Sequence, residues 1–375
     1  MPLDVWIYGS GFGESILLIW DTPDKNERHA AFIDAYGGST WESHPALRQW
    51  KAEGCPPIDC MAITHPHLDH IRNASVVLDE ACPSARALLW WGGHGLQTQE
   101  RFLGRLIQHH KIQDSEPRRA AHHTYLLVGD LNRLNRGRHI RRPDGTIPQI
   151  LEPKEIDQCH ECQTDVGPMR IHSISPWLIP QKRYTDWLNE QIVRDKNGQT
   201  IIRPSEKGVA NSISLGFLIE YGEARVFLGG DMEKDNWGDF NQERVSRKCA
   251  DALKQMHPCL IKVSHHGSNT GVIPGMWEKD QGFFGWRGNT EEQRPHCVVT
   301  PWRAGNRKLP DETVLQKIAQ SGCHVWQTGH WPEGHGIDKG TRPVASHVHF
   351  RVDGKQNHAR KMKDVFCHHL EPSLG

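Results

Sequence analysis

The feature that most constrains the fold of this chain is a cluster of metal-binding residue types directly after a short apolar strand. Residues 59–64 (DCMAIT) favour a buried strand, and the next six residues include His65, His67, Asp69 and His70. Imidazole nitrogens and carboxylate oxygens are good ligands for zinc and similar divalent ions. One loop cannot easily aim four such groups at a single ion, but it can give two to each of two neighbouring ions. The pattern therefore predicts a two-metal site at a strand end.

Two later strands end in residues that such a site needs. Residues 227–231 (FLGGD) form an apolar strand pattern that ends in Asp231, a carboxylate that can bridge two metals about 3.5–4 Å apart. Residues 261–268 form another strand pattern that ends in the pair His265 and His266. Each signal is weak alone. Together with residues 65–70 they favour one site built from three strand ends.

Strand and helix patterns alternate along the chain with hairpins between them, which predicts a layered α/β domain rather than a pure parallel sheet. Strands are predicted at 5–8, 15–20, 29–34, 59–64, 86–91, 169–174, 212–220, 225–229, 260–263, 297–300 and 324–327. Helices are predicted at 41–53, 71–79, 101–112, 184–194, 242–256 and 313–320. Residues 113–168 are rich in Arg, His, Pro and Gly and lose periodicity. We expect one domain over residues 1–375, with this segment as an insertion.

Composition narrows the function classes. Apolar residues make up 37% of the 375 residues and charged residues 24%, which is typical of a globular chain. Lys plus Arg and Asp plus Glu both total 45, so a dedicated nucleic-acid coating protein is disfavoured, although a local basic groove is not excluded. No signal peptide or membrane-spanning run is evident. The ten scattered cysteines indicate reduced thiols, so we expect a cytoplasmic protein without a membrane partner.

These segments resemble the metallo-β-lactamase superfamily. The chain is most similar to the soluble hydrolase domain of the competence DNA-uptake channel (ComEC-like) family and its stand-alone relatives, and phosphorylcholine esterases share the same motifs. The resemblance extends over residues 5–18, 33–38, 65–70, 211–215, 228–231, 262–268, 306–310, 325–329 and 350–354. It implies an α/β fold, a four-layer αβ/βα sandwich.

The resemblance also implies which side chains hold two divalent ions. The expected metal ligands are His65, His67, Asp69, His70, Asp231 and His266. The first two hold one ion, the next two hold the other, and Asp231 bridges them. One of His265 and His266 completes the second site; we favour His266, with His265 facing the substrate, although the reverse order stays open. Asp69, Asp231 and His265 are the expected catalytic residues, and Zn²⁺ is the expected ion, with Mn²⁺ as the alternative.

Two positions depart from the family pattern. Many members place another His in the first site, between the 65–70 loop and the bridging Asp, and here no single His stands out among His122, His123 and His172. Asn211 lies where the family has an amide-rich turn, and we expect it to contact substrate. Leu309 stands where many relatives have a His, so a substrate contact is expected to be lost there.

The activity expected first is that of a phosphodiesterase or nuclease that uses metal-activated water. The segment 133–142 carries five Arg, and Arg136 and Arg138 are expected to contact the phosphates of single-stranded nucleic acid. The alternative is a small-molecule hydrolase acting on a phosphoester, cyclic nucleotide, lactone or thioester at the same site. A catalytically silent interaction module is disfavoured by the intact ligand set. Nothing in the sequence identifies a protein partner.

One further motif is ambiguous. Residues 159–162 (CHEC) form a C-x-x-C sequence that could help to bind a structural zinc. No second C-x-x-C completes a four-cysteine site, so the sequence favours ordinary packing for this segment.

Overall fold

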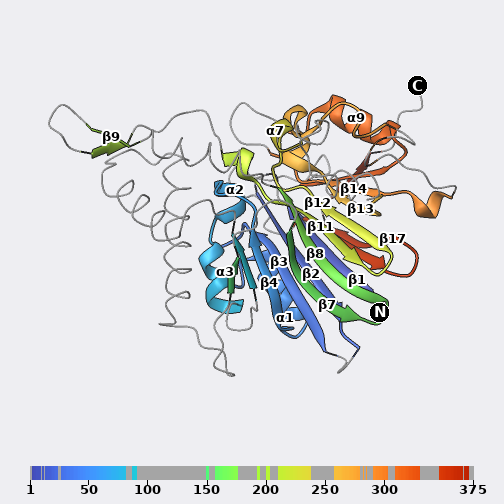
Figure 1. Ribbon diagram of the computed structural model, residues 1–375, viewed down its shortest axis with the longest axis horizontal. Helices are drawn as coiled ribbons and strands as arrows, with labels where there is room; N and C mark the ends of the chain where they lie inside the picture. The colour runs from blue at the N-terminus through green and yellow to red at the C-terminus, as the bar shows by residue number, and fades with distance from the viewer. Residues whose placement is uncertain are drawn as a thin grey trace, which may run out of the picture.

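The chain folds around two β-sheets that face each other (Figure 1). The computed structural model describes residues 2–9, 11, 13–23, 27–81, 87–90, 149–151, 157–175, 192–194, 200–202, 210–237, 257–278, 282, 284, 290–302, 309–329, 346–365 and 367–370. Each sheet has eight strands among these residues. A separate hairpin pairs β9 (Ile192–Arg194) with β10 (Thr200–Ile202). No helix in the described part of the chain is long and apolar enough to cross a membrane.

The first sheet has the strand order β17-β16-β1-β2-β3-β4-β5-β6. Its strands are β1 (Leu3–Gly9), β2 (Glu14–Asp21), β3 (Arg28–Ala35), β4 (Ile58–Ile63), β5 (Ala87–Trp90), β6 (Gln149–Leu151), β16 (His347–Asp353) and β17 (His358–Val365). The strands from β17 to β3 pair antiparallel, and those from β3 to β6 pair parallel. The sheet is therefore mixed, with its parallel half at the β6 edge.

The second sheet has the order β18-β15-β14-β13-β12-β11-β8-β7. Its strands are β7 (Asp157–Thr164), β8 (Gly167–Ser175), β11 (Gly216–Tyr221), β12 (Ala224–Leu228), β13 (Leu260–Lys262), β14 (His296–Val299), β15 (His324–Thr328) and β18 (Cys367–Leu370). The run from β12 to β15 is parallel, and the outer strands on both sides pair antiparallel.

Helices cover the outer faces of both sheets. Helix α1 (Pro45–Ala52) contacts β1 and β2, α3 (Ala74–Ala81) contacts β3, and α9 (Glu312–Gln320) contacts β15. Helix α1 begins later than predicted, because proline favours a first helical turn and the His44 ring accepts the amide N–H of Leu47.

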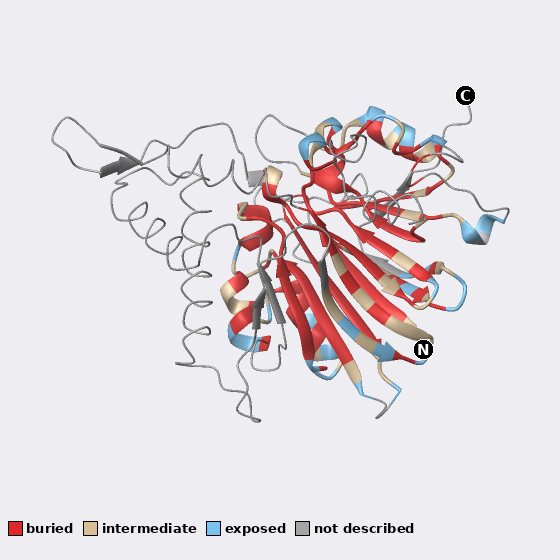
Figure 2. Cartoon of the chain, in the orientation of Figure 1, coloured by how far each residue is buried: buried red, intermediate tan, exposed pale blue. Residues whose placement is uncertain are grey.

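Side-chain alternation explains why the second sheet is buried on both faces. Phe217 and Ile219 of β11 belong to the hydrophobic cluster shared with the first sheet. Their neighbour Leu218 belongs to a second cluster that includes Val314 and Ile318 of α9. Successive strand residues point to opposite faces, so one strand contributes side chains to both clusters. The order of layers is helix, sheet, sheet, helix, and both sheets are buried over most of their length (Figure 2). The expectation of an α/β four-layer sandwich is confirmed.

Some element predictions were wrong. The predicted helix 184–194 ends in a strand, since Ile192–Arg194 pairs in β9, a segment of two β-branched residues. The predicted strand 212–220 begins with a 3-10 helix, Ala210–Ile213, before β11. The end of the predicted insertion is also regular, because β6 and β7 lie at the edges of the two sheets. The predicted helices 101–112 and 242–256, and the segment 113–148, lie outside the described residues.

The parallel strands set the position of the polar strand ends. Strands β3 and β4 are parallel neighbours in the first sheet, and β12 and β13 are parallel neighbours in the second. Because the carboxyl ends of parallel strands lie at the same edge of a sheet, the loops after β12 and β13 lie together. The loop after β4 in the first sheet lies against them, since His266 Nε2 is 2.8 Å from Asp69 Oδ2.

Candidate metal centre

The loop after β4 is held by a buried carboxylate. The backbone N–H and the hydroxyl of Thr64 both donate to Asp34 Oδ1, at 2.7 and 3.0 Å. The chain then turns at His67 into the single helical turn α2 (Leu68–Ile71), which carries Asp69 and His70 inward. This anchoring places the loop over the carboxyl end of the first sheet.

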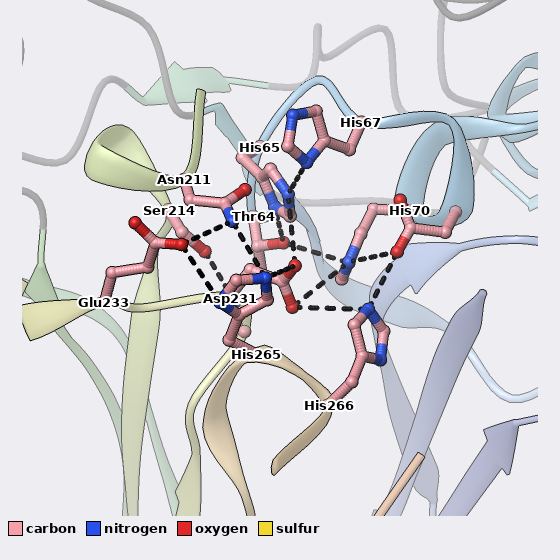
Figure 3. Close-up of polar contacts among 12 residues, drawn as sticks. Thr64, His65, His67, His70, Asn211, Ser214, Asp231, Glu233, His265 and His266 are labelled. Carbon is pink, nitrogen blue, oxygen red and sulfur yellow. Dashed lines mark hydrogen bonds and ion pairs between the residues drawn. The ribbon is translucent and has the colours of Figure 1, made fainter. Parts of the chain in front are cut away.

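Two clusters of ligand-type atoms lie at this edge (Figure 3). One contains Asp69, His70, Asp231 and His266, and the other contains His65, His67 and Asp231, with the atoms of each cluster within 4.8 Å of one another. These are the six residues expected as ligands, and the structure brings them together.

Asp231 belongs to both clusters. Its Oδ1 lies 3.4 Å from His70 Nε2 and 3.6 Å from His266 Nε2, whereas its Oδ2 lies 3.7 Å from His65 Nε2. The carboxylate is placed by a tight turn at Gly230, which has φ 48°, and a Cβ there would come within 2.5 Å of the Leu215 carbonyl oxygen. Glycine is therefore required directly before Asp231.

The buried polar atoms of the cluster fit a cation. His70 Nε2 and Asp231 Oδ1 are buried without a hydrogen-bond partner, although such atoms normally have one. His65 Nε2 and His67 Nδ1 lie 3.0 Å apart, so two imidazole nitrogens face the same point. Both clusters could hold metal ions.

Outer contacts fix the ring orientations. His70 Nδ1 donates to Asp34 Oδ2 at 2.7 Å, and His266 Nδ1 donates to the Thr300 carbonyl at 2.7 Å. Each contact leaves Nε2 with its lone pair directed into the cluster, the arrangement found in carboxylate–histidine–metal sites. The family resemblance covered Asp34, but sequence reasoning gave it no role.

The turn after β13 is strained. His265 and His266 have φ values of 44° and 53°, and Gly267 follows with φ 73°. Two consecutive left-handed non-glycine residues each cost on the order of 1–3 kcal/mol, and such strain is concentrated at functional sites. The turn sends the two imidazoles in different directions, so that only His266 joins a ligand cluster.

His265 instead faces a polar group of its own. Its Nδ1 lies 3.0 Å from Glu233 Oε1 and 2.8 Å from the Thr270 hydroxyl. Asn211 Nδ2 lies 3.2 Å from His265 Nε2 and donates to Glu233 Oε1 at 3.2 Å. Sequence reasoning missed Glu233, whose only signal was its position two residues after Asp231.

Opposing charges shape the site. Burial lowers the pKa of His65 well below its usual range, and the nearby His70 and His67 lower it further. Burial alone would raise the pKa of Asp69, but His70 and His266 outweigh it and hold that pKa well below its usual value. Burial alone would lower the pKa of His70, but Asp69 and other nearby carboxylates raise that pKa well above its usual value. A bound cation would displace the imidazolium protons, so metal affinity should fall as pH decreases.

Several expected residues are not part of this group. Arg136, Arg138, His122 and His123 lie outside the described residues. His172 lies on β8, where its Nε2 donates to Glu220 at 3.0 Å, and it does not belong to either ligand cluster.

Asp34 is expected to increase the metal affinity of the site, because it accepts a hydrogen bond from His70. Replacing Asp34 with Ala should lower metal affinity about 10–100-fold, because His70 loses the acceptor that fixes its ring. Chelator competition measured on the purified protein would give the affinity. Asp79→Ala is the matched control, because it removes an exposed carboxylate of α3 and should leave the metal affinity unchanged. Equal affinity of wild type and the Ala variant would contradict the assignment.

Comparison with known proteins gives only distant likenesses. No family model and no curated protein matches the sequence. A HARLDQ-motif mutant of a metallo-β-lactamase from Cronobacter sakazakii is 13% identical, with 68% of this chain and 75% of that chain covered and a TM-score of 0.29. Unliganded yeast PDE1 is 13% identical, with 85% and 93% covered and a TM-score of 0.37. Rm3 metallo-β-lactamase is 9% identical, with 68% and 76% covered and a TM-score of 0.28.

Proposed function

We propose that this chain is a metal-dependent hydrolase that cleaves phosphodiester bonds. The observation that supports this most directly is the position of Asp231, whose two oxygens face two different ligand clusters. A carboxylate in that position suits a pair of adjacent ions. Such a pair, when bound, stabilises both the attacking and the leaving oxygen of an in-line displacement.

The proposed ligands follow the two clusters. His65, His67 and Asp231 hold one divalent ion. Asp69, His70, Asp231 and His266 hold the other. We propose Zn²⁺ as the ion, with Mn²⁺ as the alternative, because imidazole and carboxylate ligands suit both.

His265 is the proposed proton donor to the leaving oxygen. Glu233 Oε1 accepts from its Nδ1, which holds the ring in place. Burial would raise the pKa of Glu233, but His265, Asn211 and Thr270 together lower it, so Glu233 stays ionised beside His265. Asn211 is a proposed substrate contact, because its buried Oδ1 has no hydrogen-bond partner.

The two adjacent histidines should separate by role. His266→Ala should lower metal content, because it removes a ligand. His265→Ala should keep both ions and lower turnover by roughly a hundredfold or more, since general acid catalysis contributes 10²–10⁴-fold. Metal analysis and kcat measured on the same preparations test this. Equal metal loss in both variants would refute the division.

The reaction class can be tested with small substrates. The chelated protein, reloaded with Zn²⁺ or Mn²⁺, should cleave bis(p-nitrophenyl) phosphate, and chelation should abolish the cleavage. A β-lactam, a lactone and a thioester serve as competing substrates under the same conditions. Turnover of one of these compounds without phosphodiester cleavage would overturn the proposed function. The alternative, a small-molecule hydrolase at the same site, would then be supported.

The proposed natural substrate is single-stranded nucleic acid that contacts the Arg-rich segment. Residues 133–142 include Arg133, Arg136, Arg138, Arg141 and Arg142. Replacing all five with Gln should flatten the salt dependence of strand binding by about 0.7 per lost contact. Cleavage of bis(p-nitrophenyl) phosphate should stay unchanged, because the metal ligands are intact. A variant that binds and cuts strands like wild type would remove this segment from the proposed substrate path.

A further inference from the structure

The C-x-x-C sequence lies on β7, at the opposite end of the sandwich from the metal centre. Asp59 lies at the start of β4 and His65 follows its end, so their six-residue separation corresponds to roughly 20 Å along a strand. At this far end the edge strand β7 packs against the starts of β3 and β4 in the first sheet (Figure 1).

Four side chains from three strands meet there. His160 Nε2 lies 3.5 Å from Asp59 Oδ2, and His29 Nδ1 donates to the same oxygen at 3.0 Å. Cys162 Sγ lies within 4.8 Å of the ligand atoms of Asp59 and His160. A shift in register between Gln158 and His160 places this part of β7 against the first sheet.

The spacing fits a tetrahedral metal site. Zinc bonds of about 2.0–2.3 Å place neighbouring ligand atoms roughly 3.3–3.8 Å apart, and the Asp59–His160 distance falls in that range. The indole N–H of Trp20 donates to Cys162 Sγ at 3.2 Å, a hydrogen bond of the kind that orients a ligating side chain. His29 donates to the Asp59 carboxylate, and carboxylates that bind a metal usually accept such a hydrogen bond from a neighbouring side chain.

Charge balance also points to a cation. The Asp59 side chain is completely buried, and buried carboxylates in proteins are commonly paired with a cation or coordinate a metal. A divalent ion with one carboxylate, one thiolate and one neutral imidazole is an electrically neutral set.

We propose that Asp59, His160 and Cys162 form a structural zinc site, distinct from the metal centre, that joins the edge of the second sheet to the first. His29 supports Asp59. The site ties β7 to β4 across the interface between the two sheets, where β7 has a pairing partner on only one side within the described sheet.

Cobalt substitution gives an absorption signal that the metal centre should not produce. None of the proposed ligands of the metal centre is a cysteine, so a thiolate-to-cobalt charge-transfer band would come from the Cys162 site alone. Wild-type protein, purified under reducing conditions and reconstituted with Co²⁺, should show this band, and a His65→Ala, His70→Ala variant should retain it. A wild-type spectrum without the band would overturn the proposal.

Metal analysis supplies the second test. Cys162→Ser should lose the band and about one equivalent of tightly bound zinc, and His160→Gln should do the same. Cys55→Ser is the matched control, because Cys55 is an exposed thiol that does not belong to this cluster. If Cys162→Ser folds and keeps the zinc content and melting temperature of the control, the four side chains are only a hydrogen-bonded part of the core.

Discussion

Asp231→Ala should reduce phosphodiester cleavage by more than about a hundredfold, which is the upper end of the effect of losing an outer contact at a metal site. The reason is geometric. The two oxygens of Asp231 face different clusters, so the substitution removes a ligand from both. Its loss should also reduce the metal content below two ions per chain. Single-turnover kinetics at saturating metal, with metal analysis of the same sample, would measure both effects.

Two controls separate loss of the ligand from loss of structure. Asp235→Ala changes an exposed carboxylate four residues away and should leave both cleavage and metal content unchanged. The far-ultraviolet circular dichroism of Asp231→Ala should match that of wild type, because the Gly230 turn is retained. A well-folded Asp231→Ala protein with near wild-type turnover would exclude a bridging role for this residue.

The candidate metal centre was largely predictable, because the side chains that form its two clusters directly follow strands. His65 to His70, Asp231 and the His265–His266 pair all follow apolar runs, and parallel neighbouring strands bring such ends to one edge. Residue type then decides the chemistry, since few functions other than metal binding explain so many imidazoles at one edge.

The contacts behind the ligands were not predictable, because they join segments far apart in sequence. Glu14, Lys262 and Thr300 show no common pattern, yet they meet in the core. Lys262 did carry a signal: a lysine inside the apolar strand β13 must find a partner when buried. The sequence does not identify Glu14 as that partner, since the pairing depends on how the two sheets pack.

The cluster around Cys162 could not be read from the sequence for a related reason. The C-x-x-C motif shows only residues that are close along the chain, whereas Asp59 and His29 come from the first sheet. The predicted helix 184–194 was wrong at its end, where residues 192–194 pair with β10. A short apolar segment fits a helix and a strand equally well, so its pattern alone does not decide between them.

Lys262→Met should lower the free energy of unfolding by about 3–5 kcal/mol, the usual effect of removing one partner from a buried ion pair. Both side chains of the pair are completely buried, and Lys262 Nζ lies 2.6 Å from Glu14 Oε2. The substitution leaves the Glu14 carboxylate without its cation. It also removes the donor to the Gly230 carbonyl, at 3.0 Å, which helps to hold the turn before Asp231.

Denaturant titration of chelated protein would measure this change without a contribution from bound metal. Lys51→Met is the matched control, because Lys51 and Glu80 form an ion pair of similar length, 2.7 Å, whose side chains are 28% and 34% exposed. That change should cost no more than about 1 kcal/mol. The double variant Glu14→Gln, Lys262→Met should recover part of the loss, because no charge is then left uncompensated and the new amide oxygen can still accept the Thr300 hydroxyl. If Lys262→Met is no more destabilising than Lys51→Met, the buried pair does not stabilise the junction of the two sheets.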